Sequence, residues 1–206
     1  MYIKSFKKFN EAVIIPSKIE DDYIISDIKD IKEYGERNDF LVMSYDEFYE
    51  SLPSDKARKE APPRSAPFFA LFHPVLNKPI FVISNNNALS ILTKGIIDDI
   101  IGHERIHQEQ VKRRGKITYN LPSPTDRKSY FSNKDEIMAF SWSIANDVIN
   151  KTNDFEKAKE FLISNKIQGR RYSNPLWNDI KRYCDDTTIK RYKKYIYMYL
   201  DKYLNK

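Results

Sequence analysis

The feature that most limits how this chain can fold is a long segment, residues 94–114, with the pattern of one amphipathic helix. Isoleucines recur at helical spacing through its first half, between polar residues. Lys112, Arg113 and Arg114 stand at its end with Gly115 directly behind them, the usual charge and C′ residue of a helix stop. The pattern therefore predicts a helix over residues 94–114.

Inside this predicted helix the sequence reads His-Glu-Arg-Ile-His, from His103 to His107. Residues four apart lie one above the other on a helix, so both imidazoles can reach one metal ion. Glu104 is offset by one residue, which suits contact with a water on the metal instead of the metal itself. Zinc lowers the pKa of such a water toward about 7, and a carboxylate can then take the proton. The motif predicts His103 and His107 as zinc ligands and Glu104 as general base.

The other interpretation is that the two histidines are polar residues at the end of an ordinary amphipathic helix. The chain has three histidines, so the full motif would arise only rarely by chance. Ile96 and Ile100 continue the row of the histidines, and Ile97 and Ile101 continue the row of Glu104. This pattern predicts that the ligands face the buried side of the helix.

The segment resembles the active-site helix of the zincin metallopeptidases, a superfamily that needs a third protein ligand. The extended form of its motif is absent, because Gln110 and Arg113 occupy the positions of its glycine and third histidine. A glutamate on a following helix, as in the gluzincins, is the alternative. Glu136 fits this role, since it opens a predicted helix and precedes Ala139 in a Glu-x-x-Ala pattern typical of compact gluzincin-like peptidases.

Four further residues are weighed for the site. Asp135 and Glu109 are the other candidates for third ligand, although Glu109 is expected to face solvent. Tyr130 is a candidate donor to the oxyanion of a tetrahedral intermediate, against the simpler interpretation that it is a core aromatic. His73, between Phe72 and Pro74, is interpreted as a structural residue at a strand end.

The first half of the chain predicts a small sheet. Residues 40–44 read as a strand that runs into a helix, and Ser44 and Glu47 have capping-box spacing there. Residues 68–74 and 78–84 read as the two strands of a hairpin. Residues 53–67, with four prolines, read as a flexible connection, and residues 19–28 are compatible with a strand or a helix.

The second half predicts helices: one after Ser132 or Asn133 to about Ile149, one over residues 154–164, one that opens at Asn174-Pro175, and one from about Thr188. The fold class is therefore predicted as α+β. The resemblance makes this a zincin-like fold, a small N-terminal sheet followed by a helical half.

Length and composition favour one globular domain over residues 16–206. One cysteine, Cys184, excludes an intramolecular disulfide and a cysteine-based zinc cage. No apolar run suits a membrane span, and the N-terminus lacks the apolar region of a secretory signal. The expected location is the cytoplasm or, from the segment described next, a virion.

Residues 1–15 are predicted to form a separate amphipathic segment, with Ile3, Phe6 and Phe9 at helical spacing among lysines. The stretch through Glu11 and Ala12 resembles the capsid-targeting sequences of internal proteins of T-even-like phages. Phe9 departs from that family, which prefers Leu or Ile two residues before the cleaved Glu. The resemblance implies capsid proteins as partners.

The C-terminal residues 169–206 interleave Arg, Lys and Tyr. Such a pattern can bind nucleic acid through phosphate contacts and stacking. Ile189, Tyr192, Ile196, Tyr199 and Tyr203 lie on one helical stripe, however, so the favoured interpretation is a buried aromatic face with a solvated basic face.

The leading hypothesis is thus a zinc-dependent metallopeptidase acting on a peptide or protein substrate. The alternative from another class is a non-catalytic virion protein that retains a zincin fold. A third is a nucleic-acid-binding protein, which would bind with steep salt dependence and ignore chelators.

Overall fold

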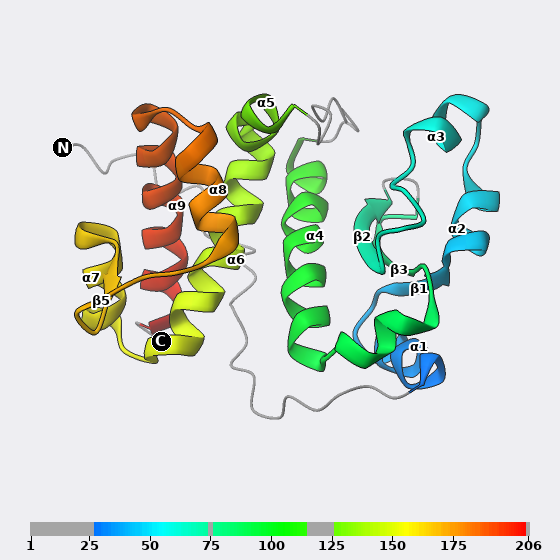
Figure 1. Ribbon diagram of the computed structural model, residues 1–206, viewed down its shortest axis with the longest axis horizontal. Coiled ribbons are helices and arrows are strands. Elements are labelled where there is room, and N and C mark those ends of the chain that lie inside the picture. The colour runs from blue at the N-terminus through cyan, green and yellow to red at the C-terminus, as the bar shows by residue number, and fades with distance from the viewer. Residues whose placement is uncertain (1–26, 74–75, 115–125, 205–206) are drawn as a thin grey trace. The chain divides into compact units, whose positions relative to one another are not determined.

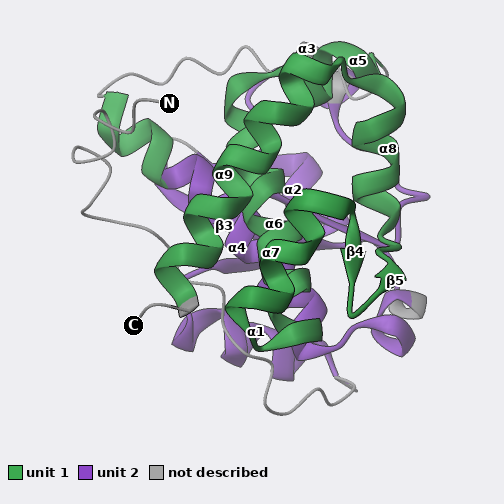
Figure 2. Ribbon diagram, turned by 90° about the vertical axis from the view of Figure 1, so that its left-hand side faces the viewer, with its two compact units in different colours: residues 1–18, 109–206 green, residues 19–108 purple. Residues whose placement is uncertain are grey.

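The computed structural model describes residues 27–73, 76–114 and 126–204 (Figure 1). The described chain forms two compact units (Figure 2), with the boundary between Gln108 and Glu109. That boundary falls inside helix α4 (Lys94–Arg114), which is continuous and has the predicted bounds. The predicted α+β class is confirmed. The single domain over 16–206 stays a prediction, and the predicted segment 1–15 lies outside the described residues.

The unit that ends at Gln108, unit 2 in Figure 2, is built on a sheet with the strand order β1-β3-β2. Strand β1 (Leu41–Ser44) runs parallel to the central strand β3 (Lys78–Ile83), and β2 (Phe68–His73) pairs antiparallel with β3. The predicted strand at 40–44 and the predicted hairpin are therefore confirmed. The apolar sequence of β3 has a physical reason, because a central strand covered on both faces buries its side chains, as five of the six residues of β3 show.

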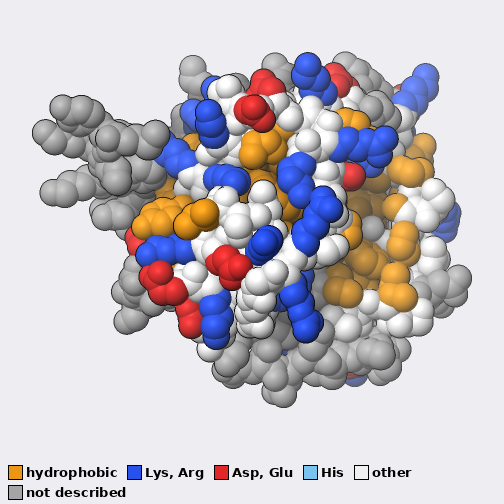
Figure 3. Space-filling model, turned by 60° about the vertical axis from the view of Figure 1, so that its left-hand side comes forward, with side chains coloured by type: hydrophobic (Ala, Val, Ile, Leu, Met, Phe, Trp, Pro, Cys, Tyr) orange, Lys and Arg blue, Asp and Glu red, His pale blue; other side chains and the backbone are white. Residues whose placement is uncertain are grey.

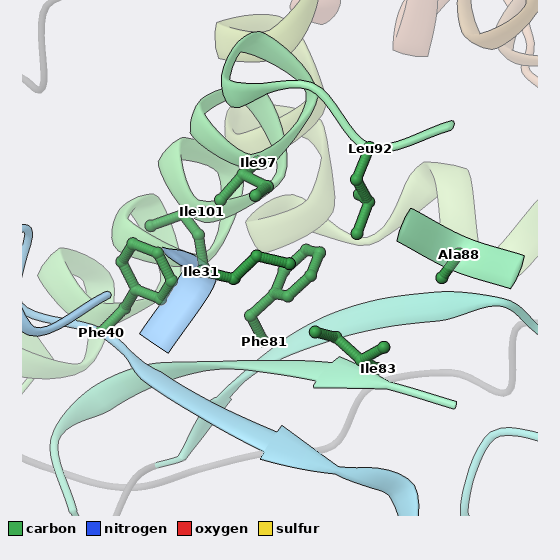
Figure 4. Close-up of a cluster of buried hydrophobic side chains, with 8 residues drawn as sticks. All are labelled: Ile31, Phe40, Phe81, Ile83, Ala88, Leu92, Ile97 and Ile101. Carbon is green, nitrogen blue, oxygen red and sulfur yellow. The ribbon is translucent and has the colours of Figure 1, made fainter. Parts of the chain in front are cut away.

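Side chains of β3 alternate between two cores, as the pleat of a strand requires. Phe81 and Ile83 belong to one cluster (Figure 4), which also contains Ile31, Phe40, Ala88, Leu92, Ile97 and Ile101. Ile80 and Val82 belong to the other, with Phe48 of the helix α2 (Tyr45–Ser51). Ile97 and Ile101 thus fix the first turns of α4 onto the sheet, since both are fully buried in its core.

Local capping signals decide the short helices of this unit. The predicted capping box before α2 is confirmed: Glu47 N donates to Ser44 Oγ at 3.2 Å, and Ser44 N donates to Glu47 Oε2 at 2.6 Å. Hydrogen bonds of the Glu47 carboxyl with the backbone and the side chain of Ser44 lower the pKa of this carboxyl. Helix α1 (Ile28–Arg37) follows an Asp27 cap. The undecided prediction for residues 19–28 stays open, because residues 19–26 lie outside the described residues.

The flexible connection predicted at 53–67 is wrong in part, because this segment contains helix α3 (Asp55–Glu60). Ser54 caps it by accepting a hydrogen bond from Ala57 N at 3.2 Å. The prolines of the segment lie outside the helix, so they do not interrupt it. A further 3-10 helix, η2 (Asn86–Ile91), leads into α4.

The unit that contains residues 109–206, unit 1 in Figure 2, packs helices around α6 (Lys134–Thr152), which is buried on most of its surface. Helix α9 (Asp186–Leu204) lies against α6 (Figure 1) and buries Tyr192, Ile196 and Tyr199, so the predicted aromatic stripe is confirmed. The other elements of this unit are α5 (Arg127–Ser132), α7 (Phe155–Ser164), β4 (Lys166–Ile167), β5 (Arg170–Arg171) and α8 (Pro175–Tyr183). Within the described residues, no helix is both long and apolar enough to cross a membrane.

Candidate metal site

Helix α4 brings the two histidines of the motif together. The Nε2 atoms of His103 and His107 lie 3.3 Å apart, with the rings edge to face at 76°. His107 and Glu104 are buried, and His103 is partly buried. The predicted sheltered face is therefore present, but Ile96 is 37% exposed and does not share it. The buried row runs through Ile97 and Ile101 instead.

Helix α6 presents Glu136 in its first turn. Asn133 caps this helix by accepting a hydrogen bond from Asp135 N at 2.9 Å. Glu136 is only 1% exposed, and Ala139, one turn further along the same helix face, is fully buried. The small side chain of the Glu-x-x-Ala pattern thus occupies a closely packed position.

The end of α4 contacts the start of α6 at Asp135, the residue before Glu136. The Gln110 side-chain amide donates to the backbone carbonyl of Asp135 at 3.0 Å. The Arg114 guanidinium donates to both carboxylate oxygens of Asp135. Planar, two-pronged contacts of this kind fix orientation as well as distance. They therefore hold the first turn of α6 in a defined position on the last turns of α4.

The contacts of Asp135 and Glu109 also favour Glu136 over these two residues as the third metal ligand. Asp135 is engaged by Arg114, and Glu109 forms an ion pair with Lys112 at 3.0 Å. The group that the described residues bring together is His103, His107 and Glu136, one ligand atom of each lying within 4.8 Å of the others.

The donor set of this group fits a metal ion. Two ligands about 2.0–2.1 Å from a tetrahedral ion are separated by about 3.4 Å, close to the 3.3 Å between the two imidazole nitrogens. A carboxylate as deeply buried as Glu136 is costly unless its charge is compensated, and a divalent cation would provide this compensation. The three residues therefore lie close enough to hold a metal ion. Without an ion, one ring nitrogen would donate to the other across the same distance.

The remaining sequence candidates take other places. The ring of Tyr130 packs against Phe131 and Phe140, with centroids 5.7 and 5.6 Å away, which agrees with its interpretation as a core aromatic. Its role as an oxyanion donor stays a prediction. His73 Nδ1 accepts a hydrogen bond from Leu76 N at 3.1 Å, so this histidine shapes the hairpin as expected.

The contacts of Gln110 and Arg114 with Asp135 were not predicted from the sequence, although the spacing of these two residues indicated a shared helix face. Gln110 and Arg114 stand seven and eleven residues after His103 and continue its helical row. The stripe of α9 predicts that Tyr192 is buried, but not that its hydroxyl donates to Phe131 O at 2.8 Å. Burial raises the pKa of this phenol far above its usual range, with Cys184, Glu136 and Tyr130 adding to the effect.

Comparison of the sequence with protein-family models, with curated proteins and with solved structures gave no match. The resemblance to the zincins therefore rests on the motif, and the grouping of the three residues rests on the geometry.

Loss of either kind of ligand should remove the metal. We expect about one metal ion per wild-type chain by mass spectrometry, and strongly reduced content in His107→Ala and in Glu136→Ala, because a site with two protein ligands binds weakly. His73→Ala is the matched control and should keep its metal. Equal content in all four proteins would contradict the site.

Loss of the ion pair between Arg114 and Asp135 should weaken metal binding without abolishing it. Arg114→Ala frees Asp135 and with it the first turn of α6, so we expect metal affinity to fall about tenfold, as for other residues that orient ligands. Lys112→Ala removes the exposed pair with Glu109 and should leave affinity within about twofold. A competition titration against a chelator measures both, and equal affinities in the two variants would exclude the positioning role.

Proposed function

We propose that this chain is a zinc-dependent hydrolase that cleaves peptide bonds, with a zincin-like fold. The observation that carries the proposal is the grouping of His103, His107 and Glu136 within 4.8 Å, since two of these residues flank Glu104 in the motif. The order of elements agrees with it, because a small sheet precedes the motif helix and Glu136 comes from the next long helix.

The ligand chemistry favours zinc among the divalent metals. Two imidazole nitrogens and one carboxylate form a common catalytic zinc set, which leaves a fourth position for water or substrate. Magnesium and calcium prefer sites made only of oxygen ligands. A bound zinc ion would supply Lewis-acid chemistry, polarising a carbonyl and making a water more acidic.

Glu104 is the residue that would move the proton. It follows His103 on α4, and the residue as a whole is 9% exposed. In this role it accepts the proton of the attacking water and passes it to the departing amine. His103, His107 and Glu136 orient the site, and the contacts of Asp135 keep Glu136 in place.

Replacement of Glu104 should separate chemistry from binding. In Glu104→Gln the metal ligands remain, so we expect wild-type zinc content with hydrolysis of unfolded, fluorescently labelled casein reduced about 10²- to 10⁴-fold. Glu109→Gln, on the same helix, is the control and should keep its activity. Full activity in Glu104→Gln would contradict its role as base, and zinc-loaded wild type inactive on all peptides would favour the non-catalytic alternative.

The virion hypothesis is independent of this chemistry. It rests on Phe6, Phe9, Glu11 and Ala12, which lie outside the described residues, and it stays a prediction.

A further inference from the structure

The helical unit, unit 1 in Figure 2, contains a basic cavity that the proposed hydrolase function does not use. Its volume is about 680 Å³, and it is lined by Arg171, Tyr172, Ser173, Asn178, Lys181 and Arg182. Pockets of a few hundred to about 1,000 Å³ hold ligands of nucleotide size. Three of the lining side chains are cationic and none is acidic.

Local structure fixes the cations around this cavity. Arg171 ends the β4–β5 hairpin, whose turn has positive φ at Gln168 and Gly169 and is anchored by Gly169 N donating to Glu160 Oε1 at 3.0 Å. Asn178, Lys181 and Arg182 come from α8, at the spacing that places them on one helix face.

The segment between the hairpin and α8 is fixed by hydrogen bonds. The Tyr172 hydroxyl donates to Asp147 Oδ2 at 2.5 Å, and the Asn174 side chain donates to the same oxygen at 3.1 Å. Asn174 also caps α8 by accepting a hydrogen bond from Trp177 N at 3.0 Å. The cavity walls on both sides of Ser173 are therefore ordered before any ligand arrives, which lowers the entropic cost of binding.

The positive charges of the cavity have no acidic partner among the residues that the structure describes. Within the described part of the chain, none of Arg171, Lys181 and Arg182 forms an ion pair, and Asp179 of α8 does not line the cavity. Burial lowers the pKa of the Lys181 ammonium, and the neighbouring charges of Arg171 and Lys193 lower it further. Figure 3 shows many Lys and Arg side chains on the side of the molecule that carries α7, α8 and α9.

The aromatic residues beside the cavity limit what it can recognise. Tyr172 lines the cavity, and the Lys181 ammonium lies 6.0 Å from the ring centre of Trp177. Both aromatic residues are buried, so their ring faces are not open for the stacking that reads single-stranded bases. Arg171 and Arg182 are exposed, and guanidinium groups match phosphate oxygens in a two-pronged geometry. The serine and asparagine add neutral hydrogen-bonding groups.

We propose that this cavity binds phosphate groups, with Arg171, Lys181 and Arg182 as the contacts. The phosphates come from a free nucleotide or from the backbone of a nucleic acid, and base identity plays no part in the binding. This site would give the basic C-terminal residues a specific role in place of a general surface charge.

The test compares Arg171→Gln/Arg182→Gln with the control Lys190→Gln/Arg191→Gln, both in the full chain and with a chelator present to keep the metal site out of the measurement. Lys190 and Arg191 are exposed on α9 and do not line the cavity, so both variants change the net charge equally. The probes are ATP and a fluorescent single-stranded 12-nucleotide DNA.

We expect the cavity variant to bind the probe at least about tenfold more weakly than the wild type and the control variant to stay within about twofold. The reason is that hydrogen bonds between arginine and phosphate, both charged, contribute much of the binding free energy. Binding of ATP, with competition against the DNA, assigns the site to free nucleotides. Binding of the DNA alone, with a slope of about −2 in log K against log salt for three contacts, assigns it to a backbone. Equal losses in both variants, or no binding of either probe, would overturn the proposal.

Discussion

The Glu136 carboxylate is buried beside two imidazoles, and this arrangement requires both a compensating charge and helices that hold the three groups in fixed positions. A carboxylate at 1% exposure needs compensation of its charge, and a cation held with His103 and His107 would provide it. Such a cation also needs its ligands in fixed positions. The two-pronged contact from Arg114 and the bond from Gln110 meet this need, because both act on the residue next to Glu136.

The same argument explains why α4 is long and uninterrupted. Its first turns are buried in the sheet core through Ile97 and Ile101, and its last turns hold Asp135. The two histidines lie between these anchored ends, so their spacing depends on a helix that is held along its length. Rigid elements position reactive groups more accurately than loops do.

Sequence predicted the parts of this arrangement that depend on local signals. The bounds of α4, the capping box of Ser44 and Glu47, and the Asn174 cap of α8 follow from short patterns, and all are present. The four prolines of residues 53–67 indicate a flexible connection, so neither α3 nor its Ser54 cap was predicted. Long-range contacts could not be predicted from the sequence. Periodicity places Gln110 and Arg114 on one helix face, but only the fold shows that both contact Asp135. Ile96 was expected on the sheltered side, and its exposure reflects a rotation of the buried row toward Ile97 that periodicity alone does not resolve.

X-ray absorption at the zinc edge of the zinc-loaded chain tests the central claim most directly. The account predicts nitrogen and oxygen ligands at about 2.0–2.1 Å, with the outer scattering of two imidazoles and no sulfur. A spectrum with fewer than two imidazoles, or with sulfur at about 2.3 Å, would contradict the His103, His107 and Glu136 site.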